Sequence, residues 1–481
     1  MKEITGDLRN WRFFFKEPGA EEVFQKFERA VKNSCWDCFR IFKTTTGRRR
    51  IYLFQPPNTS QRYLIKAYLS PRIFKQVKYL VRASRCQQEF IASERLTRLG
   101  FASPPALFFG YERKRFGLWG AELVLEPFWE EKNFEEIWER AEEPERKRLF
   151  EELAYLVINL HHQGVLQRDF KPDSLLVKKD PKGIKFIISD LERIKFFHFS
   201  LGLRRRINNL GKVVQAFFSL KPCPELNWFL EAYYSQAGLR IKREKFFLQV
   251  ILSARKQLVK HAEQRKSWAK DTNELIERYF IQGWEVRRFK TIDAKWLEQG
   301  LKARRLKPGQ SLDWLENQIK IFPAQNSRAV METYFFLREL EIPAFQVALA
   351  LSSQKGNSGL VGIIYPREAV NLREFLNKEP ATKEFISQLG RWLFRLELFG
   401  IMPEMDPEKN LFVCKEAEGN YKLMIARSDR LRIKSTLPSP KSLTPSRSGL
   451  LTQLVGQLAL SREEKELVCF GFEQAKELYF I

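Results

Sequence analysis

The sequence predicts an α+β protein made of two related domains, and three observations support this prediction. First, residues 164–194 form a pattern typical of a short β-hairpin, with one aspartate before its first strand and another after its second. Second, several short strands and a helix precede this hairpin, and an apolar helix leads into it. Third, the same order of segments returns about 240 residues later. We expect each domain to combine a small β-rich N-lobe with a helical C-lobe.

The hairpin is the segment on which the functional prediction depends. Its two apolar runs, residues 175–177 and 184–188, flank an Asp-Pro-Lys-Gly turn. Phosphoryl transfer needs one carboxylate that accepts the proton of the attacking hydroxyl and a second that holds the magnesium ion on the nucleotide phosphates. We expect Asp169 to be the base, Lys171 a cation beside the phosphate, and Asp190 the metal ligand. The plainer alternative is that both aspartates only cap turns.

The segment QRDFKPDSLLV…FIISDLERI resembles the catalytic and metal-binding segments of the protein-kinase-like fold. Its SDLER ending resembles the lipopolysaccharide core kinases, the bacterial family that phosphorylates Kdo or heptose. The resemblance implies transfer of phosphate from ATP, with Mg²⁺, to a sugar hydroxyl of the lipopolysaccharide inner core, and it gives Arg168 and Arg193 supporting roles. Two positions depart from the pattern. Gln167 replaces the usual histidine, and Ser174 replaces a metal-binding asparagine with a weaker magnesium ligand.

Two residues upstream are candidates for the ion pair that positions nucleotide phosphates. Lys66 ends an apolar strand, and Glu89 lies early in the helix that follows. A strand lysine taken alone more often faces solvent, and Glu94 is a rival partner, but the order of residues after Glu89 resembles the family pattern. A further strand ends at Glu126, where hinge backbone groups would pair with adenine. No glycine-rich GxGxxG loop is present, and Gly47 is more simply a hairpin tip.

Composition limits the partners and the compartment. The 481 residues contain 83 Lys and Arg against 58 Asp and Glu, a net charge of +25, which predicts an anionic partner such as the lipopolysaccharide core. The basic residues are spread along the chain, so nucleic acid is not expected.

No apolar run reaches the ~18–20 residues that span a bilayer. Six scattered cysteines suit a reducing cytoplasm. We expect a cytoplasmic protein, with peripheral contact to the inner membrane as an option. Arg204–Arg206 are either a solvated helix face or a clamp for an anion.

The second half repeats the first with changes at the chemical positions. We place the first domain at residues 1–265 and the second at 266–481, with the polar stretch 260–271 as the linker. The second-domain counterparts of Lys66, Glu89, Ser174 and Asp190 are Lys320, Glu332, Asn410 and Asp429.

Met405 falls opposite Asp169, and a thioether cannot accept a proton, while Asp406 is displaced by one position. We therefore expect the second domain to be a degenerate kinase domain, or pseudokinase, which retains residues that can hold a nucleotide.

Two other functions remain open at this point. A tandem pseudokinase that acts as a scaffold or regulator fits the departures at Gln167 and Ser174. A kinase that acts on protein or small-molecule hydroxyls fits Lys171, because that lysine is usual in protein Ser/Thr kinases and because fold alone does not determine the acceptor. The acceptor sugar and the oligomeric state do not follow from the sequence.

Overall fold

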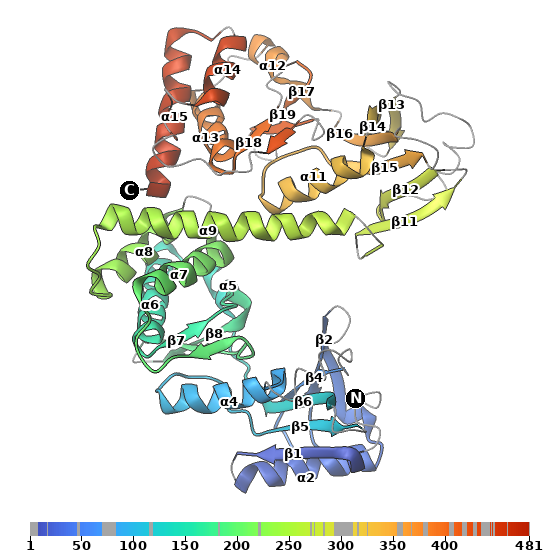
Figure 1. The fold of residues 1–481 in the computed structure, drawn as a ribbon, viewed down its shortest axis with the longest axis vertical. Coiled ribbons are helices and arrows are strands. Elements are labelled where there is room, and N and C mark those ends of the chain that lie inside the picture. The colour runs from blue at the N-terminus through green and yellow to red at the C-terminus, as the bar shows by residue number, and fades with distance from the viewer. Residues whose placement is uncertain are drawn as a thin grey trace. The chain divides into compact units, whose positions relative to one another are not determined.

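The structure is a computed structural model, and it describes residues 8–16, 18–45, 49–69, 83–114, 119–180, 183–219, 223–269, 272–273, 275–281, 284–292, 311–314, 317–324, 326–353, 359–366, 368–378, 383–403, 408–415, 421–426, 431–433, 443, 445, 448–458 and 460–480. The chain divides into two compact units (Figure 1). The first comprises Met1–Phe217 with Pro224–Arg240, and the second comprises Phe218–Cys223 with Ile241–Ile481. Both units contain helices and sheets, so the predicted α+β content is confirmed.

The first unit begins with a six-stranded antiparallel sheet in the order β1-β5-β6-β4-β3-β2. Its strands are β1 (Trp11–Phe15), β2 (Phe39–Thr45), β3 (Arg49–Phe54), β4 (Tyr63–Tyr68), β5 (Phe108–Arg113) and β6 (Trp119–Pro127). The sequence analysis did not anticipate β1, which pairs with β5 at one edge.

Among the described residues, two α-helices and two short 3-10 helices accompany this sheet. The short η1 (Leu8–Asn10) precedes β1, and α2 (Pro18–Lys32) places Phe27 edge-on against Phe54 of the sheet, where both rings are fully buried. The short η2 (Trp36–Cys38) leads into β2. After β4, α4 (Arg85–Arg98) begins where the Ser84 hydroxyl accepts a hydrogen bond from the backbone N–H of Gln87. This capped helix carries Glu89.

The helical part of the first unit contains the hairpin on which the prediction was based. It comprises α5 (Phe134–Trp138), α6 (Glu143–His162), β7 (Val165–Gln167), η4 (Pro172–Ser174), β8 (Leu175–Asp180), β9 (Gly183–Ile188), β10 (Ile194–Phe196), α7 (Leu203–Phe218) and α8 (Pro224–Gln236). β8 and β9 pair antiparallel, so the predicted hairpin is confirmed. Gly164 turns the chain from α6 into β7 at a φ of +69°, and a Cβ there would lie 2.5 Å from the Phe197 carbonyl oxygen.

The second unit has its own six-stranded antiparallel sheet, in the order β11-β12-β15-β16-β14-β13. Its strands are β11 (Ile276–Ile281), β12 (Trp284–Phe289), β13 (Ser311–Trp314), β14 (Asn317–Ala324), β15 (Val347–Ser353) and β16 (Gly359–Pro366), and α11 (Ser327–Glu339) follows β14. A second hairpin, β19 (Leu411–Lys415) with β20 (Tyr421–Ile425), lies further along the chain. The remaining elements are α9 (Arg243–Arg265), η5 (Lys266–Ala269), β17 (Val370–Asn371), α12 (Leu372–Lys378), α13 (Lys383–Leu398), β18 (Ile401–Pro403), β21 (Leu431–Ile433), α14 (Gly449–Gln457) and α15 (Arg462–Phe480).

Helices α13 and α15 pack closely because glycines remove side chains at their contact. A Cβ on Gly390 would lie 2.0 Å from the Val468 carbonyl oxygen. Nearby, the rings of Phe394 and Phe472 meet edge to face with centroids 5.2 Å apart.

Most of the predicted linker at residues 260–271 is helical, because α9 continues to Arg265 and η5 ends at Ala269. Its polar residues form one face of α9 that binds α11. His261 Nδ1 lies 2.6 Å from Glu339 Oε1, and Arg265 Nε lies 3.3 Å from Glu339 Oε2. Ala262, which directly follows His261, is fully buried. α9 therefore groups with the second unit, whereas the sequence analysis placed the domain boundary after it.

A search of the described residues finds no helix that combines the length and the apolar character needed to cross a membrane.

Candidate active site

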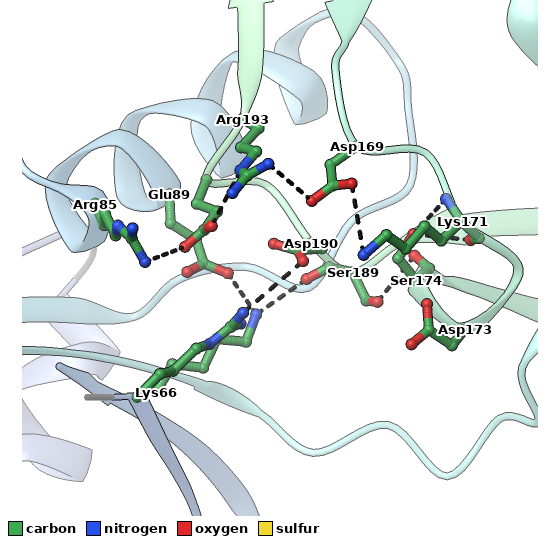
Figure 2. A network of polar contacts seen from close by, with 12 residues as sticks. Lys66, Arg85, Glu89, Asp169, Lys171, Asp173, Ser174, Ser189, Asp190 and Arg193 are labelled. Carbon is green, nitrogen blue, oxygen red and sulfur yellow. Dashed lines mark hydrogen bonds and ion pairs between the residues drawn. The ribbon is translucent and has the colours of Figure 1, made fainter. Parts of the chain in front are cut away.

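Lys66 lies on β4 and is buried, and its ammonium group contacts two carboxylates. Figure 2 shows its contacts with Glu89 and with the main chain of Ser189. Lys66 Nζ donates to Glu89 Oε1 on α4 and lies 2.8 Å from Glu126 Oε1 on β6. It also donates to the main-chain oxygen of Ser189 at 3.0 Å. The structure thus pairs Lys66 with Glu89, the partner that the sequence analysis preferred. Glu94, the rival, pairs instead with Arg98 on the exposed side of α4.

Glu126 joins this cluster in a way that the sequence analysis did not anticipate. We expected its backbone at a hinge, but its side chain is 2% exposed and contacts Lys66. Burial, with the nearby charge of Glu89, raises the pKa of Glu126 to about 7 although Lys66 opposes this shift. Burial also raises the pKa of Glu89. For Lys66, burial disfavours the charge, but Glu126 and Glu89 outweigh it and raise its pKa.

Asp169 follows β7 and lies between two cations (Figure 2). Its Oδ1 is 3.5 Å from Lys171 Nζ, and its Oδ2 is 3.3 Å from Arg193 Nη1. The carboxylate is only partly buried, so a substrate hydroxyl has access to it. The side chain of Arg168 is exposed, and its carbonyl oxygen accepts a hydrogen bond from Lys212. Of the predicted residues in this segment, the structure brings Asp169, Lys171 and Arg193 together.

Asp190 follows β9 and presents a carboxylate suited to a metal ion. Within the described part of the chain, its Oδ1 is buried and has no hydrogen-bond partner, and its Oδ2 lies 3.9 Å from Arg49 Nη1. A buried carboxylate oxygen without a partner is costly unless a cation occupies the position next to it. The Asp190 side chain therefore fits a magnesium ligand, the role the sequence predicted for it.

Ser174 has most of its hydrogen-bonding capacity committed to the turn before β8. Its Oγ donates to the Lys171 carbonyl oxygen at 2.8 Å and accepts from the Lys171 N–H at 3.1 Å. A hydroxyl has one donor and two acceptor lone pairs, so one lone pair remains for a metal ion. The hydroxyl thus has a structural function in addition to the metal-binding role predicted for it.

A cavity of about 450 Å³ lies beside Lys66, Glu126 and Asp190. Phe42 of β2 and Phe128, which directly follows β6, both line it, and their ring centroids are 5.9 Å apart. The cavity is thus apolar where these rings meet and charged where the ammonium and carboxylates lie. Its other lining residues are Lys43, Arg49, Ile51, Leu64, Pro104, Pro127, Trp129, Glu130, Glu131, Lys132, Asn133, Glu136, Asp173, Ser174, Leu176 and Ser189. A combination of apolar walls and a few convergent polar groups is typical of a small-molecule site.

Further contacts around the site were missed from the sequence. Glu192, in the Asp-Leu-Glu-Arg segment, is buried and accepts a hydrogen bond from the Tyr68 hydroxyl of β4 at 2.6 Å. It also lies 3.9 Å from Arg85 and 3.5 Å from Arg193. Burial opposes the charge of Glu192, but Tyr68 and the neighbouring arginines lower its pKa. The only signal in the sequence was its place between Asp190 and Arg193.

Arg206 was a candidate for an anion clamp, and that interpretation is wrong for this residue. Its side chain is buried, and its Nε donates to the Leu201 carbonyl oxygen at 2.6 Å. Arg205 lies over the ring of Phe197. Arg206 therefore holds the start of α7 in place.

The second-domain counterparts have other partners. Lys320 Nζ lies over the ring of Tyr365, 4.4 Å from its centroid, and Glu332 binds Arg328 on the same helix at 2.9 Å. Asn410 is buried before β19, and its carbonyl oxygen accepts from the Ala426 N–H. Asp429, Met405, Asp406 and Gly47 lie outside the described residues.

The fold and this site are consistent with the protein-kinase-like class. Residues 39–229 match the family described as "Lipopolysaccharide kinase (Kdo/WaaP) family". This match confirms the resemblance seen in residues 164–194 and supports a kinase activity. A solved structure described as "WaaP in complex with acyl carrier protein" is 17% identical, and the match covers 51% of this chain and 97% of that chain with a TM-score of 0.37. No curated protein matches the chain.

Proposed function

We propose that the first unit is an ATP- and Mg²⁺-dependent kinase that phosphorylates a sugar hydroxyl of the lipopolysaccharide inner core. The observation that carries this proposal is that Lys66, bound to Glu89, and Asp190 line the same cavity. The family match over residues 39–229 supports the substrate class. The net charge of +25 agrees with an anionic acceptor at the inner-membrane surface.

The proposed mechanism assigns one task to each charged group. Asp169 orients the acceptor hydroxyl and accepts its proton as the oxygen attacks the γ-phosphorus. Arg193 and Lys171, which lie beside the Asp169 carboxylate, orient this carboxylate and stabilise the negative charge that develops on the phosphoryl group. Lys66 binds the nucleotide phosphates, and Glu89 directs it toward them.

Asp190 would hold the magnesium ion through its buried Oδ1, with the remaining lone pair of Ser174 as a second, weaker contact. When bound, magnesium neutralises phosphate charge and orients the transferred group. Arg49, 3.9 Å from Asp190 Oδ2, supplies a fixed positive charge at the same end of the cavity.

We further propose that the second unit is a degenerate copy of the first. Five strands follow the same order in the two sheets: β3-β4-β6-β5-β1 corresponds to β13-β14-β16-β15-β12. A parallel bridge joins Ala102 to Ile187 in the first unit, and one joins Ala344 to Ile425 in the second. Gly164 and Gly400 both have a φ of +69° at the turn after a long helix. These features support a duplication of one architecture.

A direct test measures transfer of radiolabelled phosphate from ATP to deacylated inner-core saccharide. Wild-type protein should transfer label, and Asp169→Ala should lose about 100- to 10,000-fold of the rate, because a positioned base contributes about that much. ATP binding by the variant should persist, since Asp169 is absent from the cavity lining. Equal transfer by both proteins would refute the assignment of Asp169.

The same assay separates the two alternative functions. Binding of ATP without transfer to any acceptor would favour the scaffold, while transfer to protein substrates or small alcohols but not to core saccharide would favour a kinase of another substrate class.

A further inference from the structure

The hydrogen bonds of Lys66 leave no room for a ligand. An ammonium group has three N–H donors and no acceptor. In the structure Nζ has three acceptors around it: Glu89 Oε1, Glu126 Oε1 at 2.8 Å and the Ser189 carbonyl oxygen at 3.0 Å. Every donor is therefore already used. A nucleotide phosphate that binds Lys66 must displace one of these three acceptors.

Two of the three acceptors are held in place by their own surroundings. Glu89 lies on α4 and is fully buried. The Ser189 main chain is fixed because its N–H and its hydroxyl both donate to the Ser174 carbonyl oxygen, at 3.0 and 2.9 Å. Displacement of Ser189 would move the segment that carries Asp190, and Glu89 does not line the cavity in which a ligand would lie.

Glu126 is the acceptor that can release Lys66 with the least rearrangement. Its side chain lines the cavity, whereas that of Glu89 does not. Each of the two carboxylates contacts Lys66 through Oε1, and among the described residues neither Oε2 has a hydrogen-bond partner. Loss of the contact between Glu126 and Lys66 changes one side chain at the border of the cavity and leaves the backbone of β6 unchanged.

The charges around Glu126 determine what happens when Lys66 leaves it. The groups that act on it are Lys66 on β4, Glu89 on α4 and Arg49 on β3. Once Lys66 binds a phosphate instead, Glu126 remains buried and near Glu89. The negative charge of the ligand then lies close to it as well. Burial and like charge both disfavour an ionised carboxylate. Its pKa is about 7 while Lys66 is still in contact, so the pKa without that contact lies higher.

We propose that Glu126 is a positioning residue that holds Lys66 in the nucleotide-free protein and releases it to the nucleotide by taking up a proton from solvent. This inference rests on the proposed function, because it needs a nucleotide to bind in the cavity. The step involves one proton, which passes from solvent to the Glu126 carboxylate. Lys66 keeps all of its protons, and one of its N–H groups changes its hydrogen-bond acceptor from that carboxylate to a phosphate oxygen. The ionised carboxylate thus weakens nucleotide binding at high pH, and its protonation strengthens binding at lower pH.

The experiment is titration calorimetry of MgATP binding near pH 8, in two buffers with different ionisation enthalpies. ATP is fully ionised there, and Glu126 in the free protein is mostly ionised. Wild-type protein should take up about one proton on binding. Glu126→Gln should show little or no uptake and should bind roughly three- to tenfold more tightly at this pH, because the competing charge is gone. For the wild type the dissociation constant should fall as the pH is lowered from 8 to 7, by up to about tenfold.

Glu122→Gln is the matched control. Glu122 lies on the same strand four residues earlier and is also buried, but its contacts are with Ser84 and the backbone of Arg85 and Cys86. This variant should keep the wild-type proton uptake. The wild-type measurement alone tests the inference if a variant does not fold.

The outcomes separate the inference from the proposed function. MgATP binding with the same proton uptake in wild type and Glu126→Gln would overturn the role of Glu126 while leaving the kinase assignment intact. Absence of any MgATP binding by the wild-type protein would overturn the proposed function and this inference with it.

Discussion

The side-chain amide of Gln167 donates to the main-chain oxygen of Asp190 at 2.6 Å. Its own carbonyl oxygen accepts from the Asp169 N–H at 3.3 Å. One buried amide therefore connects the segment that carries the proposed base to the segment that carries the proposed metal ligand. A glutamine can do this because it offers a donor and an acceptor on one planar group. Gln167 thus links the two segments from the position where the family pattern has histidine.

Removal of this amide should misplace the two carboxylates relative to each other. We expect Gln167→Ala to lower kcat by about 100-fold, since a shift of about 1 Å is enough for a loss of that size. The KM for ATP should change little, because Gln167 does not line the cavity. Gln167→His, which restores the family residue, should recover most of the rate. A loss that appears in KM alone would contradict this role.

The hairpin could be predicted from local pattern, whereas the pairing of Lys66 with Glu89 was predicted from the order of residues in the family that the chain resembles. Lys66 also donates to the main chain of Ser189, the residue before Asp190, which lies far from it in the sequence. The role of Glu126 could not be predicted, since the direction of its side chain depends on the register of β4 against β6, in which Leu64 pairs with Glu126. The end of α9 was misjudged because its polar residues serve an ion pair with Glu339 rather than solvent.

The two strand lysines provide an internal comparison of the two units. Lys66 has carboxylate partners beside the cavity, whereas Lys320 lies over Tyr365. We expect Lys66→Met to lower kcat/KM at least 100-fold, because it removes the cation that positions the phosphates. Lys320→Met should change kcat/KM less than about twofold. A large loss from the second variant would show that the second unit takes part in the reaction.

The hydrogen bond from Tyr68 to Glu192 should stabilise the first unit. Tyr68→Phe removes the hydroxyl donor and leaves a buried oxygen of the Glu192 carboxylate without this hydrogen bond. The free energy of unfolding should therefore fall by about 1–3 kcal/mol. Urea denaturation followed by tryptophan fluorescence measures this change. Tyr111→Phe, at a half-exposed position on β5 of the same sheet, is the control and should have a smaller effect. Equal losses would mean that the Glu192 contact adds nothing beyond the general cost of the substitution.

His161 should make the stability of the first unit sensitive to acid. The ring is fully buried at the end of α6, and burial lowers its pKa to about 4. Its Nε2 is 2.8 Å from Asn209 Oδ1 and its Nδ1 is 2.7 Å from the Tyr233 hydroxyl, and Asn209 in turn donates to the Gln167 carbonyl oxygen at 2.6 Å.

In the unfolded chain the imidazole of His161 has its ordinary pKa near 6.5. As the pH falls below that value, the unfolded state therefore binds a proton that the folded state does not. The free energy of unfolding should therefore decrease between about pH 6.5 and 4, by up to about 3 kcal/mol, with no further loss from this group below pH 4. His161→Gln, which cannot take up the proton, should show a shallower dependence over this range in urea denaturation at fixed ionic strength, and an unchanged slope would assign the acid sensitivity to other groups.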